Sequence, residues 1–135
     1  MARSAAETAR TEVENLKQTL LRLDSVANLV DAIAIMDEIK RSHRNELWDN
    51  VLLDRYSALR RKLTAVKISK VNINEDYATA IQGAIVHFRN IEKQVEQSLN
   101  NKSERPATAK LNAIISAQTD KVDEVLNAMK QDIGE

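Results

Sequence analysis

The sequence predicts an all-α protein, an elongated up-and-down helical bundle of four to five helices. The chain has two glycines and one proline among 135 residues, so the tight turns that strands require are scarce. Apolar residues recur at spacings of three and four in every long segment, which indicates amphipathic helices. The polar stretches between these segments are short, and short connections make successive helices antiparallel neighbours.

The first predicted helix covers about Arg3 to Leu23. Its apolar residues follow positions a and d of a heptad: Ala6, Ala9, Val13, Leu16, Leu20 and Leu23. Glu12 falls at g and Lys17 at the following e, a pair that would attract across a parallel dimer. Two interpretations remain open. Residues 1–24 form a coiled-coil-like helix, the end of a longer stalk before a bundle of residues 25–135, or this helix is one side of the bundle.

A second helix is predicted over about Val26 to Arg41, with Asp24 or Ser25 as its N-cap. Its apolar residues are Val26, Leu29, Val30, Ile33, Met36 and Ile39. The heptad pattern of the first helix also continues through Ala27, Val30 and Ala34, so the boundary is either a kink or absent. The polar stretch from Lys40 to Glu46 is predicted to be a loop, which would leave His43 solvated.

Three further helices follow the same periodicity. The third covers about Leu47 to Ile68, and its stripe is Trp48, Leu52, Tyr56, Leu59, Leu63 and Val66. The fourth covers about Glu75 to Leu99, where Asn74 is a good N-cap. Its stripe is Tyr77, Ile81, Ala84, Phe88, Ile91 and Val95. The fifth covers about Pro106 to Gln131, with Leu111, Ile115, Val122, Val125 and Met129 as its stripe and Gln118 interrupting it.

Composition argues against several classes of function. Lys and Arg total 20, as do Asp and Glu, so the formal net charge is zero. The chain therefore has no overall positive charge that would attract it to nucleic acid or to an acidic membrane. The absence of cysteine excludes disulfides and cysteine-based sites. No apolar run approaches the roughly 18 residues that span a bilayer. Neither a Gly-rich phosphate loop, a Gly-x-Ser-x-Gly elbow nor an HExxH pair is present. We therefore expect no enzyme activity, no metal and no cofactor.

A local excess of basic residues marks the region from Lys40 to Lys70. Its candidate patch comprises Lys40, Arg41, Arg44, Arg55, Arg60, Arg61 and Lys62. Such a patch could bind nucleic acid, an acidic lipid surface or an acidic partner helix. Solvation and pairing with acidic residues between Glu75 and Glu96 is the favoured interpretation. Aromatic residues that could stack on bases are not interleaved with these charges, which disfavours nucleic acid.

Two single residues also need an interpretation. Trp48 is favoured as a plug at the end of the bundle core over an exposed hot spot for a partner. His87 lies on the shoulder of the fourth stripe, where a partly buried histidine with an ordinary hydrogen bond is favoured over a ligand in the core.

The stretches DAIAIMDEIKRSHRNELWDNVLLDRYSALRRKL (31–63) and IQGAIVHFRNIEKQVEQSL (81–99) resemble helical regions of undefined function in bacterial proteins. Those regions follow an N-terminal membrane helix and a short coiled coil. The resemblance implies a domain tethered to a membrane through sequence outside this chain, and it implies that residues 1 to about 12 are the cut end of a longer stalk. It supplies no catalytic residues.

The sequence thus predicts a non-enzymatic, cytoplasmic helical scaffold or protein–protein interaction module, which acts by self-association or partner docking. Its candidate interaction residues are Val13, Leu16, Leu20, Leu23 and Trp48. Two alternatives remain. One is a sensory bundle that binds a small ligand between its helices, and the other is a binder of nucleic acid or acidic lipid through the Lys40–Lys70 region.

Overall fold

The computed structural model describes residues 4–134, in which four long α-helices and one short 3-10 helix occur without any strand. The helices are α1 (Ala5–Arg44), α2 (Asn50–Ile68), α3 (Glu75–Ser98), η1 (Lys102–Glu104) and α4 (Thr108–Gly134). The predicted all-α class is therefore confirmed. Arg3, at which we expected the first helix to begin, lies outside the described residues.

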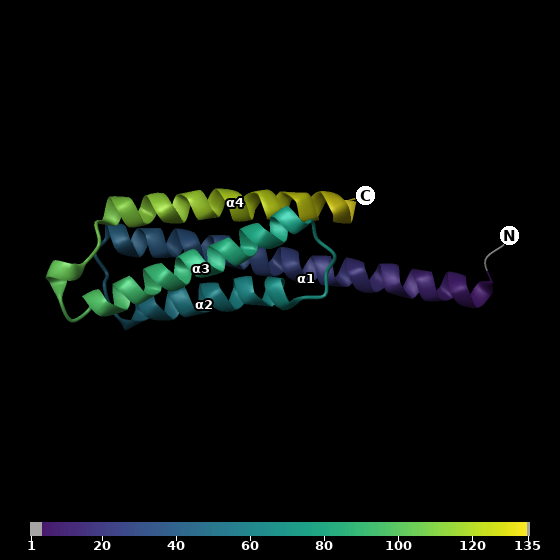
Figure 1. Cartoon of the computed structure of the whole chain (residues 1–135), viewed down its shortest axis with the longest axis horizontal. Helices are drawn as coiled ribbons and strands as arrows, with labels where there is room; N and C mark the ends of the chain where they lie inside the picture. The colour runs from purple at the N-terminus through teal and green to yellow at the C-terminus, as the bar shows by residue number, and fades with distance from the viewer. Residues whose placement is uncertain (1–3, 135) are drawn as a thin grey trace.

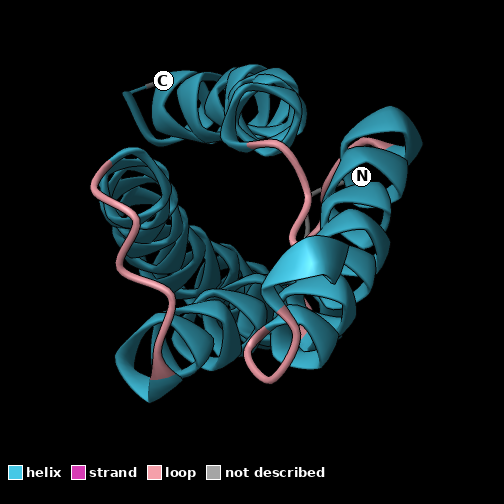
Figure 2. Ribbon diagram, turned by 90° about the vertical axis from the view of Figure 1, so that its left-hand side faces the viewer, coloured by secondary structure: helices cyan, strands magenta, loops and turns pink. Residues whose placement is uncertain are grey.

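The four long helices run alternately up and down (Figure 1). α1 packs against α2 and α4, and α3 closes the bundle by packing against the same two helices. Seen along the long axis, the helices surround a common core (Figure 2). That core is mainly aliphatic, and its largest fully buried side chains are Tyr56 and Phe88. An apolar stripe on each helix, rather than helix propensity alone, thus holds the elements together.

α1 is one continuous helix of 40 residues. Of the two possibilities left open at Asp24–Ser25, a kink or no boundary, the second is correct, because the apolar pattern continues without interruption and the small Ser25 side chain fits inside the core, where it is buried. The helix also has an N-cap: the Ser4 hydroxyl accepts a hydrogen bond of 3.2 Å from the backbone N–H of Glu7. The boundary expected between residues 24 and 25 therefore lies inside a single helix.

The connection between α1 and α2 differs from the prediction at both of its ends. The loop expected over Lys40–Glu46 is wrong, since α1 continues to Arg44. α2 begins later than predicted because Asp49 caps it, accepting a hydrogen bond of 3.0 Å from the N–H of Leu52. Trp48 consequently lies in the connection before α2 and not in the helix. Asn74 caps α3 as expected.

The N-terminal part of α1 extends beyond the rest of the bundle (Figure 1). Residues 5–17 are all exposed, and Gln18 marks the point where the bundle begins. Its amide donates to the carbonyl oxygen of Lys70 at 3.2 Å and accepts from the N–H of Asn72 at 2.9 Å. These two hydrogen bonds tie the α2–α3 connection to α1 at the base of the extension.

Candidate functional site

The two faces of α1 have different surroundings. The inner face points into the bundle, and its buried residues at heptad positions c and f are Ser25, Leu29, Ala32, Met36, Ile39 and His43. The outer stripe, which we define as Ala6, Ala9, Val13, Leu16, Leu20, Leu23, Ala27, Val30 and Ala34, occupies positions a and d. Positions a and d lie opposite c and f on a helix, so the outer stripe faces away from α2, α3 and α4.

The large residues of the outer stripe are strongly exposed. Their relative exposures are 67% for Val13, 60% for Leu16, 54% for Leu20, 47% for Leu23 and 45% for Val30. Single exposed apolar residues are common on proteins, but a row at heptad spacing is the pattern of a helix that pairs with another helix. The helices of one chain leave this row uncovered, although α1 from Gln18 onward is one side of the bundle.

The inner face explains why the bundle stops at Gln18. Before Ser25, positions c and f carry only polar residues, namely Thr8, Thr11, Asn15, Gln18 and Arg22. A polar face has no apolar surface that α2 or α4 could bury. The N-terminal half of α1 therefore has one apolar face, the outer stripe, while the C-terminal half has two.

A second notable feature is a buried polar network at the far end of α1. His43 is fully buried, contrary to the expected solvated loop residue, because α1 continues far enough to place it on the inner face. Its Nδ1 lies 2.8 Å from Asn112 Oδ1, and its Nε2 lies 2.8 Å from the Tyr56 hydroxyl. Asn112 in turn donates to the carbonyl oxygen of Lys40 at 3.2 Å.

This network fixes the tautomer of the histidine. Since the Asn112 amide nitrogen donates to Lys40, its oxygen accepts, and His43 Nδ1 must carry the hydrogen. Nε2 is then free to accept from the Tyr56 hydroxyl. Burial lowers the pKa of His43, although the hydrogen bond with Asn112 opposes this shift. Burial, and secondarily the charge of Glu92, raises the pKa of Tyr56. Both side chains are therefore neutral near pH 7 and hold the helices together without net charge.

Trp48 covers this network from the solvent side. Its ring stacks on His43 with a centroid distance of 4.9 Å and an interplanar angle of 13°. The Arg105 guanidinium lies over its ring at 4.9 Å. Trp48 is partly buried and packs against the core, so it acts as the end plug that the sequence favoured. We did not predict that His43, Tyr56 and Asn112 form a unit, although the seven-residue spacing from Met36 to His43 places His43 on the inner face.

The predicted basic patch is distributed over α1 and α2 and is largely paired within the chain. The ion pairs are Lys40–Asp37 at 3.6 Å, Arg55–Glu38 at 3.5 Å, Arg60–Glu92 at 2.6 Å and Lys62–Asp31 at 3.0 Å. Arg41, Arg44 and Arg61 are exposed. Three of the four acidic partners belong to α1, and Glu92 alone comes from the expected segment between Glu75 and Glu96. This pairing reduces the charge available to an acidic ligand.

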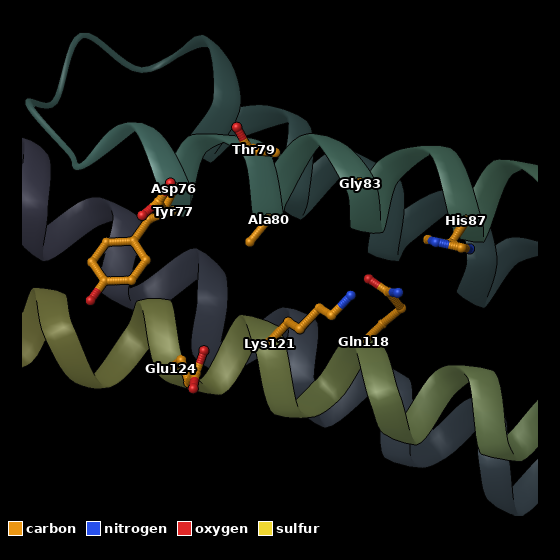
Figure 3. Close-up of a pocket in the computed structure, with 9 residues that line it drawn as sticks. All are labelled: Asp76, Tyr77, Thr79, Ala80, Gly83, His87, Gln118, Lys121 and Glu124. Carbon is orange, nitrogen blue, oxygen red and sulfur yellow. The ribbon is translucent and has the colours of Figure 1, made fainter.

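A cleft of about 540 Å³ lies between α3 and α4. Figure 3 shows Tyr77 of α3 reaching toward α4, and Gln118 and Lys121 of α4 reaching toward α3. Gln118 is the one buried side chain among the residues that line the cleft. His87 also lines it but is exposed, so the expectation of a partly buried histidine is wrong. Gly83 faces open space and permits no close helix contact. Gln118 is thus a single buried polar group in this cleft, whereas ligand sites typically combine several convergent polar groups.

Other classes of site receive no support from residues 4–134. That range holds no cluster of His, Asp and Glu side chains that could bind a metal ion. Within the same residues, every helix is too short or too polar to cross a bilayer. No protein-family model matches the chain, and comparisons with curated proteins and with solved structures find no significant similarity. The outer stripe of α1 is thus the strongest candidate site.

Proposed function

We propose that this protein is a non-enzymatic helical interaction module that self-associates through the outer stripe of α1. The observation that carries the proposal is the continuous row of exposed apolar residues from Val13 to Val30, on the face opposite the bundle. Burying apolar area is the main driving force of protein association. We further propose a cytoplasmic location, which a chain without cysteine allows.

Two features of the outer stripe suit an association of modest strength. Apart from Val30, its ends carry alanine, at positions 6, 9, 27 and 34, and alanine buries little apolar surface. Its centre holds Val13, Leu16, Leu20 and Leu23, which bury much more. Copies of the module would therefore associate at high concentration and dissociate at low concentration. A scaffold needs that behaviour when it assembles only where many copies are gathered.

Sedimentation equilibrium of the full chain tests the proposal. We expect concentration-dependent association, and we expect Leu20→Lys to abolish it because a charge would enter the centre of the contact. Asn15→Lys is the matched control, since it adds the same charge on the polar face of the same exposed segment. Both variants should keep the wild-type helicity and melting temperature at low concentration. A wild-type chain that stays monomeric at the highest soluble concentration would refute the function.

A further inference from the structure

The charged residues that flank the outer stripe have an unusual order. Position e of the heptad holds Arg10, Lys17, Asp24 and Asp31, so the basic residues lie toward the N-terminus of α1 and the acidic residues follow. Position g on the other flank holds Glu12, Thr19, Val26 and Ile33 and carries one charge. The charge along one flank therefore changes sign near the middle of the stripe.

This order distinguishes the two ways in which a second copy can pair. Position e faces position g of the neighbour in a parallel pair, whereas it faces position e of the neighbour in an antiparallel pair. The parallel pair gains one kind of attraction, between Glu12 and Lys17. The antiparallel pair brings Lys17 opposite Asp24 and Arg10 opposite Asp31. Twofold symmetry produces every attraction twice in either arrangement, so the antiparallel pair has four and the parallel pair two.

We infer that the partner on the outer stripe is a second copy of this chain, bound antiparallel. The inference rests on the proposed function and specifies its geometry. In this register Leu20 packs against Leu23 and Val13 against Val30 of the second copy. Leu16 packs against Ala27, so a large residue meets a small one, and Ala9 meets Ala34. The paired segment, residues 9–34, is about 40 Å long.

The antiparallel pair also covers the exposed extension of α1. From residue 9 onward, the extension of each copy lies along residues 26–34 of the other, where α1 is already held by its own bundle on the inner face. Position g adds no repulsion, because Glu12 falls opposite Ile33 and Thr19 opposite Val26. Asp31 already binds Lys62 at 3.0 Å, so Arg10 would share this carboxylate. Lys17 and Asp24 form no ion pair within residues 4–134, which makes them the cleaner test.

Disulfide trapping distinguishes the two orientations. The chain has no cysteine, so Val13→Cys and Val30→Cys each introduce a single thiol. A disulfide needs Cα atoms within about 7 Å, and the antiparallel pair separates identical positions by about 25 Å. We expect neither variant to cross-link alone under redox equilibration and the two to cross-link when mixed. Cross-linking of Val13→Cys with itself would overturn the antiparallel arrangement.

A charge exchange on the otherwise native chain gives an independent result. We expect Lys17→Glu to weaken dimerisation by about tenfold, since it turns two symmetry-related attractions into repulsions. Adding Asp24→Lys should restore the affinity, and adding Glu12→Lys should not. Rescue by Glu12→Lys instead would establish parallel pairing and leave self-association intact. Absence of any wild-type dimer would overturn both the orientation and the proposed function.

Discussion

The inner and outer faces of α1 carry apolar residues at the same heptad spacing, yet one face is buried and the other is exposed. Leu29 and Met36 on the inner face are fully buried, while Leu16 on the outer stripe is 60% exposed. The difference does not come from the type of residue, because both faces contain large aliphatic side chains. It comes from the side on which α2 and α4 pack against α1, which is the inner face. Heptad spacing thus indicates that a face of a helix needs a partner. The packing of the other helices decides whether the same chain supplies that partner.

The largest expected contrast is the same substitution made on each face. We expect Leu29→Ala to lower the free energy of unfolding by about 2–5 kcal/mol, because it leaves a cavity in the core. Leu16→Ala should change it by less than about 0.5 kcal/mol in the monomer, while weakening self-association. Chemical denaturation at low protein concentration measures the first effect, and sedimentation measures the second. Equal losses of monomer stability would show that the two faces are wrongly assigned.

The last inner-face residue of α1 is His43, and its ionisation should make the free energy of unfolding depend on pH. Burial holds the folded-state pKa of His43 below its ordinary value of about 6.5. The unfolded chain therefore binds a proton at a higher pH than the folded chain. As the pH falls below about 6.5, the free energy of unfolding should decrease, and the decrease should stop below the folded-state pKa.

Denaturation curves between pH 7.5 and about 5 check this expectation. His43→Gln should be less stable than wild type at pH 7, since the network with Tyr56 and Asn112 is disrupted. It should also lose the part of the pH dependence that His43 supplies. His87→Gln, at an exposed position, is the matched control and should retain it. A His43→Gln variant with the full wild-type slope would show that another group titrates.

The fold was largely predictable because each long segment carries its own apolar stripe. The stripes of α2 and α3, such as Leu59 and Phe88, are buried as their spacing indicated. The continuity of α1 was harder, because Asp24 and Ser25 are good N-caps as well as tolerable helix residues. The choice between these roles depends on whether neighbouring helices have room for Ser25, which is a tertiary property.

The candidate site was predictable in part. The heptad pattern placed Val13, Leu16, Leu20 and Leu23 on one face, but it could not determine whether the bundle covers them. That depends on where α2 and α4 lie, and hence on the polar inner residues between Thr8 and Arg22. The network around His43 escaped prediction because the charged residues beside it resemble a loop. A buried polar residue such as His43 can be recognised only when its hydrogen-bond partners on other helices are known.

The smallest expected contrast concerns ion pairs inside the bundle and beside the outer stripe. Arg60 of α2 binds Glu92 of α3 through two nitrogens, and Glu92 is only 14% exposed. Lys62 binds Asp31 beside the stripe, where their exposures are 39% and 54%. We expect Arg60→Gln to cost about 1 kcal/mol of unfolding free energy, because a bidentate pair is lost and Glu92 remains partly buried. Lys62→Gln should cost at most about 0.5 kcal/mol, because water screens its pair.

Raising the salt concentration to about 1 M should remove most of the Lys62 effect and less of the Arg60 effect. Denaturation at low and high salt measures both, and equal losses for the two variants would show that the flank of the outer stripe is as shielded from solvent as the interior of the bundle.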